Sequence, residues 1–141
     1  MNAPHVVDIA DLELFAGCTK AELKQIRSLT TYVQVPKDQV LMREGNPAHE
    51  FIIIDSGKAR VSRVTDDGVT EVAEVGSGDF LGEMALLNGS RRTATATAET
   101  DLGVLVSSAS EFRSILRLAP SVADKIVQAS IDRAAALDLA A

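Results

Sequence analysis

The residues best suited to chemistry lie in one stretch, 76–95, which combines glycine turns, a carboxylate and an arginine. Glu83 stands at the start of an expected short helix, whose unpaired backbone N–H groups and positive dipole end favour an anion. Arg92 follows nine residues later, with a planar guanidinium that matches phosphate oxygens. An anion would repel the Glu83 carboxylate unless that carboxylate accepts a hydrogen bond from a nearby hydroxyl. A sugar that carries both a phosphate and a free hydroxyl satisfies both groups, so the stretch indicates a nucleotide pocket.

The same stretch resembles the phosphate-binding cassette of cyclic nucleotide-binding domains. The usual cassette reads Phe-Gly-Glu-aliphatic-Ala-Leu-Leu, then a short gap, then Arg-(Thr/Ser/Ala)-Ala-Thr. Residues 82–87 and 92–95 match this form with the expected gap, and the resemblance extends over about residues 12–136. Because the register of the second half places Arg92 in the motif, its neighbour Arg91 is expected to be a solvated loop residue.

The resemblance implies a role for each residue of the cassette. Arg92 would pair with the exocyclic oxygens of a cyclic phosphate, and Glu83 would accept a hydrogen bond from the ribose 2′-hydroxyl. Backbone N–H groups of Gly82, Thr93 and Ala94 would complete the phosphate site. The Thr93 hydroxyl would lie near the phosphate or the base.

Five further positions are expected near the base by the same resemblance: Val61, Val72, Val75, Met84 and Leu137. The three valines lie on expected strands that face the base in the family, and a core role suits them equally well. Met84 fits packing as well as ligand contact. Leu137 falls roughly where family members place a base-capping residue on the last helix.

The identity of the base is inferred from two details of the cassette. Among kinase-type members, Thr at the position of Thr93 is associated with cyclic GMP and Ala with cyclic AMP, whereas bacterial transcription-factor-type members carry Ser or Thr and take cyclic AMP. Leu81 separates Phe80 from Gly82, as in bacterial catabolite-activator-type members. The resemblance therefore favours cyclic AMP over cyclic GMP as the ligand, and no further cofactor is expected.

Composition narrows the classes of partner and reaction. With 14 Lys and Arg against 20 Asp and Glu, the formal net charge is −6, which argues against direct nucleic-acid binding. Cys18 is the only cysteine, and His5 and His49 lack partners at metal-ligand spacing, so neither a disulfide nor a metal site is expected. No Gly-x-Ser-x-Gly elbow occurs, and no histidine is placed to activate a serine. The sequence therefore predicts a binding protein rather than an enzyme, with no catalytic residue.

The chain carries no targeting or membrane signal that sequence rules recognise. Residues 1–15 contain three acidic residues and no Lys or Arg, so they lack the basic and apolar regions of a signal peptide. Apolar runs such as 51–54 are far too short to cross a bilayer. We therefore expect a cytoplasmic protein without a membrane partner.

Glycines recur at short intervals from Gly45 to Gly103, with brief β-branched runs between them. Such short strands and tight turns are typical of a sandwich or jelly roll. We expect a single domain over 1–141, mainly β with flanking helices: a helical segment at about 8–30, a β-roll at about 31–107 and two C-terminal helices at about 108–139. The resemblance implies the same order, a double-stranded β-helix interrupted by the short cassette helix.

Several element boundaries also follow from the sequence. Thr19 and Glu22 form a capping-box pattern before a short amphipathic helix, Ser108 or Ser110 can cap the first C-terminal helix, and Pro120 suits the first turn of the second. The strand runs are expected at 39–43, 50–55, 58–64, 69–75, 93–98 and 103–107.

The sequence supports one leading function and two alternatives. The leading hypothesis is a cyclic nucleotide sensor, in which ligand binding lets the helix at 123–136 close over the base and so moves the C-terminal helices. The alternatives are a ligand-free jelly roll that serves as an interaction or dimerisation scaffold, and the regulatory fragment of a larger effector protein. A homodimer through the last helix would use Val127, Ile131 and Ala134, and an effector protein or domain would receive the signal.

Overall fold

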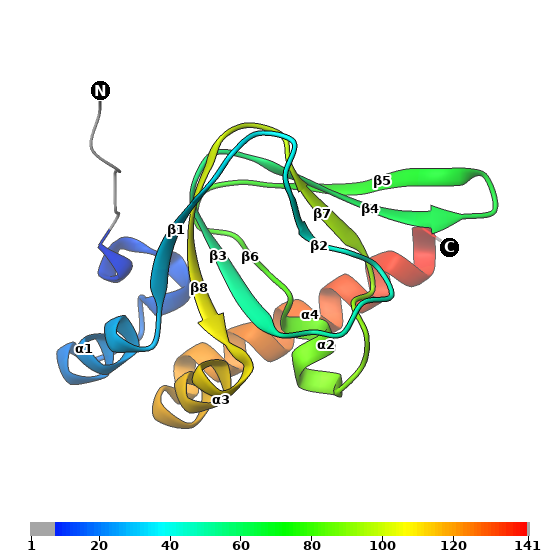
Figure 1. Ribbon diagram of the computed structural model, residues 1–141. Helices are drawn as coiled ribbons and strands as arrows, with labels where there is room; N and C mark the ends of the chain where they lie inside the picture. The colour runs from blue at the N-terminus through cyan, green and yellow to red at the C-terminus, as the bar shows by residue number, and fades with distance from the viewer. Residues whose placement is uncertain (1–7, 141) are drawn as a thin grey trace.

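The computed structural model describes the backbone of residues 8–140 and the side chains of residues 8–135 (Figure 1). The elements are, in chain order, η1 (Ile9–Asp11), η2 (Glu13–Phe15), α1 (Lys20–Ser28), β1 (Thr31–Val35), β2 (Val40–Met42), β3 (Glu50–Ser56), β4 (Ala59–Thr65), β5 (Gly68–Val75), β6 (Phe80–Leu81), α2 (Glu83–Asn88), β7 (Thr95–Ala98), β8 (Leu102–Ser108), α3 (Ala109–Leu118) and α4 (Pro120–Ala140).

The strands form two four-stranded antiparallel sheets that face each other. One has the order β1-β8-β3-β6 and the other β2-β7-β4-β5. In Figure 1 the β4–β5 ribbon extends beyond the roll, and α4 runs beneath the roll toward that ribbon. This is the predicted double-stranded β-helix with flanking helices, and the fold prediction is confirmed.

Strand β3 is buried on both faces of its sheet. Side chains alternate between the two faces of a strand. Phe51 and Ile53 pack among the helices, whereas Ile52 and Ile54 pack inside the roll, and all four are at most 3% exposed. A continuous apolar run is therefore required here, because both sides of the strand exclude water.

The helix ends follow the predicted capping chemistry. At α1, the Glu22 N–H donates to Thr19 Oγ1 over 3.1 Å and the Thr19 N–H donates to Glu22 Oε1 over 2.8 Å. At α3, Ser108 and Glu111 exchange the same pair of bonds, so Ser108 rather than Ser110 is the N-cap. Pro120 is the first residue of α4, as predicted.

Three details differ from the predicted elements. The segment before α1 forms two 3₁₀ turns, and β6 is a strand of two residues that is too short to show a period in the sequence. Strand β7 begins at Thr95, not at residue 93. The backbone at Arg92 is instead bonded to the loop before β3, since Gly45 N donates to Arg92 O and Arg92 N donates to Asn46 O, each over 2.9 Å.

No helix in the part of the chain that the structure describes is long and apolar enough to span a membrane.

Candidate functional site

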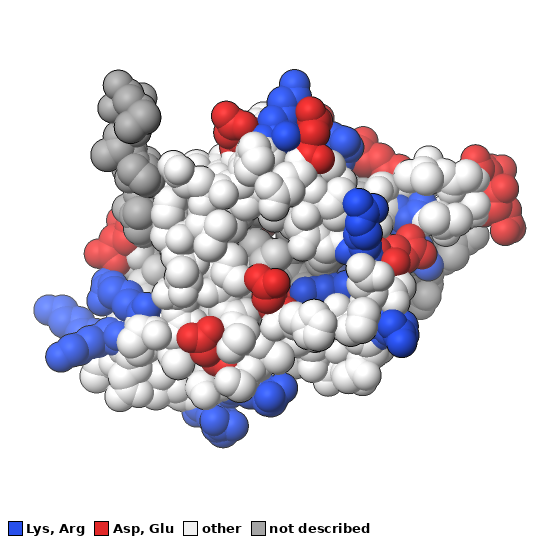
Figure 2. All heavy atoms as spheres, viewed as in Figure 1, with Lys and Arg blue, Asp and Glu red and all other residues white. Residues whose placement is uncertain are grey.

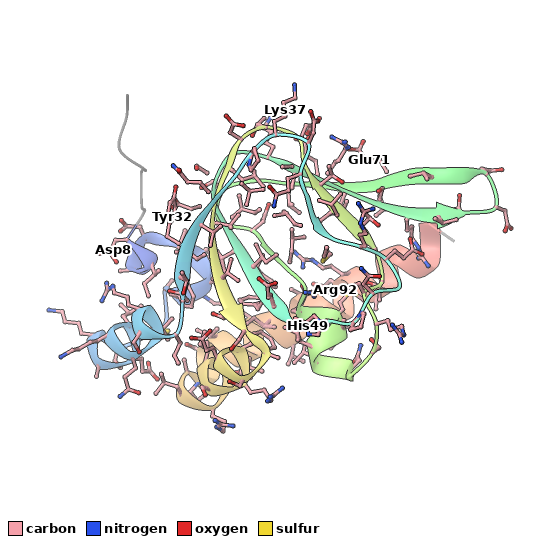
Figure 3. All side chains as sticks on the ribbon, viewed as in Figure 1. Asp8, Tyr32, Lys37, His49, Glu71 and Arg92 are labelled. Atoms are coloured by element: carbon pink, nitrogen blue, oxygen red, sulfur yellow. The ribbon has the colours of Figure 1, made fainter. Side chains whose placement is uncertain are left out.

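A cavity of about 120 Å³ lies between the β4–β5 ribbon, α2, the loop before β7 and α4. Figure 3 shows Arg92 between the roll and α2, at this position. Nine of the ten residues predicted for the phosphate, ribose and base sites line the cavity: Val61, Val72, Val75, Gly82, Glu83, Met84, Arg92, Thr93 and Ala94. The tenth, Leu137, belongs to α4, and its side chain lies outside the described residues.

Gly82 allows the start of α2 to lie close to the Arg92 side chain. It is the N-cap of α2 with φ +92° and ψ 0°, a left-handed conformation that glycine adopts without a steric penalty. A Cβ atom at this position would lie 2.6 Å from Arg92 Nη1 and 2.8 Å from the Glu50 carbonyl oxygen. Glycine is therefore needed here both for its backbone angle and for the space that the arginine occupies.

We expect Gly82→Ala to destabilise the protein more than Gly78→Ala, its matched control. Gly78 has nearly the same angle, φ +89°, but an added Cβ there meets nothing within 4 Å. The control should lose only the cost of a left-handed alanine, about 1–2 kcal/mol. Gly82→Ala should lose about 1–3 kcal/mol more, because the Cβ displaces packed atoms. Urea unfolding of both variants measures the difference, and equal losses would show that the contact with Arg92 is easily relieved.

Arg92 is a buried cation held by backbone carbonyls. Its side chain is 7% exposed, Nη1 donates to Gly82 O over 3.0 Å, and Nη2 donates to Glu50 O over 2.7 Å. Burial lowers the pKa of the guanidinium, while the carboxylates of Glu50 and Glu83 oppose this shift. A guanidinium has five N–H donors, and these two bonds use two of them. The remaining donors make no further bond to the described residues, so they are available to an anion in the cavity.

Glu83 is a carboxylate with one occupied and one free oxygen. The residue is 1% exposed, and Oε1 accepts a hydrogen bond from Arg133 Nη1 over 2.5 Å. Oε2 is buried and has no hydrogen-bond partner among the described residues. Burial raises the pKa of the carboxyl, whereas the charges of Arg133 and Arg92 lower it. A free buried acceptor beside the cavity is suited to a ligand hydroxyl, because an unpaired buried oxygen is otherwise costly.

Arg133 is a site residue that sequence reasoning missed. It lies on α4, pairs with Glu83, and its guanidinium carbon is 4.8 Å from the centroid of the Phe80 ring. The sequence analysis places the base-capping residue at Leu137, about one helical turn further on. A signal was present, since Arg133 and Lys125 are the only cations on the alanine-rich α4.

The rest of the cavity is mainly apolar. Besides the predicted valines and Met84, the sequence missed Met42, Ala73, Leu81 and Ala85 as lining residues. Thr93 Oγ1 lies 4.0 Å from Met84 Sδ, at the boundary between the polar and apolar parts. Val75 and Leu81 also belong to the core inside the roll, so the core and cavity roles of such residues coincide. The cavity thus combines an anion site, a hydroxyl acceptor and an apolar surface.

In the described part of the chain, no group of three or more His, Cys, Asp or Glu residues is placed to hold a metal ion.

Comparison with known proteins identifies a family and several longer relatives. The family profile described as "Cyclic nucleotide-binding domain" matches residues 32–118. The acetyltransferase Pat of Mycolicibacterium smegmatis is 36% identical over 129 residues, which cover 92% of this chain and 38% of that protein.

Solved structures that share the fold include two that are more than 25% identical to this chain. The Catabolite Activator Protein of Thermus thermophilus has a TM-score of 0.79 at 27% identity, over 89% of this chain and 60% of that one. The regulatory domain of Toxoplasma gondii PKA, solved with cAMP, has a TM-score of 0.70 at 26% identity, over 76% of this chain and 41% of that one. The chain therefore spans less than two thirds of each of these three relatives.

Proposed function

This chain belongs to the cyclic nucleotide-binding domain family, and from that premise we propose that it is a regulatory module that binds cyclic AMP. One observation carries the proposal: a buried guanidinium with free donors and a buried carboxylate oxygen without a partner line the same small cavity. A ligand that presents an anion and a hydroxyl together satisfies both groups, and a cyclic nucleotide does so with its phosphate and its ribose 2′-hydroxyl.

In this proposal each part of the cavity binds a different part of the nucleotide. Arg92 pairs with the exocyclic phosphate oxygens, and the backbone N–H groups of Gly82, Thr93 and Ala94 complete the anion site. Glu83 Oε2 accepts from the ribose hydroxyl. The base lies against the apolar surface made by Val61, Val72, Val75 and Met84, which line the cavity.

We further propose that α4 couples the site to the rest of the molecule. The Arg133–Glu83 pair joins α4 to the first residue of the cassette helix, 50 positions away in the sequence. A ligand hydroxyl on Glu83 changes the charge environment of the pair, so the position of α4 depends on occupancy. The output is then passed to an effector protein or domain, and the module itself catalyses no reaction.

The dimerisation alternative has one observation in its favour. Val127 and Ile131 on α4 are 44% and 57% exposed, and they lie four residues apart on one side of the helix. A second copy packed against this face would bury them. Sedimentation measurements with and without cyclic AMP decide between a monomer and a dimer.

Calorimetric titration of the purified, nucleotide-free chain with cyclic AMP and then cyclic GMP tests the proposed function. We expect saturable binding of cyclic AMP with a dissociation constant of about 1 μM or below, which corresponds to about 8 kcal/mol. Cyclic GMP should bind more weakly under the same conditions. Calorimetry suits this chain, because it contains no Trp and a single Tyr to report by fluorescence. An absence of heat with both nucleotides, from folded protein, would favour the scaffold alternative.

A further inference from the structure

A second hollow lies on the outer side of the cassette, between α2, the loop before β3 and the start of α3. It is an open groove of about 420 Å³. Apolar side chains contribute to its lining, namely Pro47, Ala48, Ala85, Leu86 and Ala109. Arg91, from the loop after α2, and Arg113, from α3, also line it. A lining that combines apolar side chains with two arginines has the composition of a docking site for a protein segment rather than for a free ion.

The two arginines of this groove have no carboxylate partner among the described residues. Both are exposed, and the Arg91 guanidinium donates from Nη1 to the Gly45 carbonyl oxygen over 3.1 Å. Figure 2 shows Lys and Arg side chains over α3 and beside α2. The chain has 20 acidic residues against 14 basic ones, so these two arginines lack a carboxylate partner in the described part of the chain although acidic side chains are abundant. Two unpaired arginines beside one apolar groove therefore complement an acidic ligand.

The groove is physically joined to the nucleotide cavity. Arg91 and Arg92 are consecutive, yet Arg91 lines the groove while Arg92 lines the cavity. Gly45 N donates to Arg92 O and Arg92 N donates to Asn46 O, so the loop whose Pro47 and Ala48 line the groove is bonded to the backbone of Arg92. Ala85 lines both hollows. The backbone at Arg92 is therefore shared between the cavity and the loop that lines the groove, which gives nucleotide binding a route to the groove.

We propose that this groove docks an acidic segment of a partner protein, whose carboxylates pair with Arg91 and Arg113 while an apolar side chain packs on Leu86. Charge complementarity and the apolar residues of the lining together select such a segment. The longer relatives are consistent with this occupant, since the chain covers only 38% to 60% of two of them and a regulatory module must contact an output unit. The docking itself does not require the proposed function, whereas any effect of nucleotide on the docking rests on it.

Nuclear magnetic resonance titration of the ¹⁵N-labelled chain with a blocked hexapeptide of alternating glutamate and leucine tests the docking. We expect saturable shifts in the amides of Gly45, Asn46 and Ala48 and of residues 85–91 and 109–113. The double variant Arg91→Glu, Arg113→Glu should weaken binding by about tenfold or more, because two attractive contacts become repulsive. Arg117→Glu is the matched control: it changes an exposed arginine of the same helix outside the groove, and it should retain the affinity.

Several results would overturn the docking site: no saturable shift, equal weakening by Arg117→Glu, or equal binding of a lysine–leucine hexapeptide. Competition by inorganic phosphate at the same affinity would reduce the groove to an anion site and would also overturn the docking site.

The same peptide titration in the presence of saturating cyclic AMP tests the link between nucleotide binding and docking, because coupling between two sites is reciprocal. A peptide affinity that is unchanged by bound cyclic AMP would remove the link and leave the docking. A chain that binds no cyclic AMP would refute the proposed function, and the titration with peptide alone would still decide the groove.

Discussion

Replacement of Arg92 by alanine is expected to lower the affinity for cyclic AMP by about 30-fold to several thousand-fold, which corresponds to about 2–5 kcal/mol. The guanidinium is 7% exposed, so its pairing with a phosphate is shielded from water, and the phosphate would remain buried without a countercharge in the variant. Calorimetry of the folded variant with cyclic AMP measures the loss. An unchanged affinity would end the proposed role of this residue.

The adjacent arginine provides the control for this experiment. Arg91→Ala removes the same charge from the next position, but Arg91 is exposed and lies outside the cavity, so the affinity for nucleotide should change by less than about twofold. Arg92→Lys is the second variant. It keeps the charge and loses the planar fork, and it should bind with an intermediate affinity. This series separates the geometry of the guanidinium from the overall charge.

The stability of Arg92→Ala must be measured alongside its affinity. Arg92 also donates to the carbonyls of Gly82 and Glu50, so its removal leaves two backbone acceptors without these partners. Circular dichroism during thermal unfolding shows whether the variant is folded at the temperature of the titration. Arg92→Lys is informative even if the alanine variant unfolds, because its ammonium can still donate to one of these carbonyls.

The cassette could be predicted from the sequence because its residues are nearly contiguous. Gly82, Glu83 and Arg92 lie within one short stretch, and the local rules for glycine turns and helix starts place them together. The jelly roll was predictable for a similar reason, since each strand is followed by its own turn signal. Capping boxes at Thr19 and Ser108 were equally local.

The missed features depend on contacts between distant parts of the chain. The Arg133–Glu83 pair joins residues 50 apart, and its formation depends on how α4 crosses the roll. No local pattern gives that crossing. Strand β6 has two residues and exists because Ile52 and Ile53 of β3 pair with Leu81 and Phe80. Likewise, β7 begins only at Thr95, and shortly before it the backbone of Arg92 is bonded to the loop at 45–46, a contact between distant segments that no local pattern gives.

Glu83 gives the site a pH dependence whose sign follows from its burial. Burial raises the pKa of this carboxyl in the folded state above the ordinary value of 4.5, so the folded protein holds the proton more tightly than the unfolded chain does. The contribution of Glu83 to stability is therefore complete below about pH 4.5 and is lost as the pH rises through the folded-state pKa. Urea unfolding from pH 4 to 8 measures this loss, and Glu83→Gln should remove it.

Replacement of Arg133 by methionine is expected to make the binding of cyclic AMP strongly pH-dependent. The Arg133 charge lowers the pKa of Glu83, so its removal leaves burial less opposed and shifts that pKa upward. Glu83 then becomes protonated nearer to neutral pH, and a protonated carboxyl is a weaker acceptor for the ribose hydroxyl. The affinity of the variant should rise with pH by up to about tenfold per pH unit below the new pKa, because one proton is released on binding.

A double-mutant design separates this effect from the loss of a helix contact. Arg133→Lys keeps a positive charge near Glu83, so its pH profile should stay close to that of the parent chain, although the guanidinium contact with the Phe80 ring is lost. In a Glu83→Gln background, Arg133→Met should leave the affinity independent of pH, since the group that titrates is absent. If Arg133→Met alone binds cyclic AMP with the parent profile from pH 5 to 8, Arg133 does not control the charge of Glu83. Its pair with Glu83 would then serve only to dock α4 against the cassette.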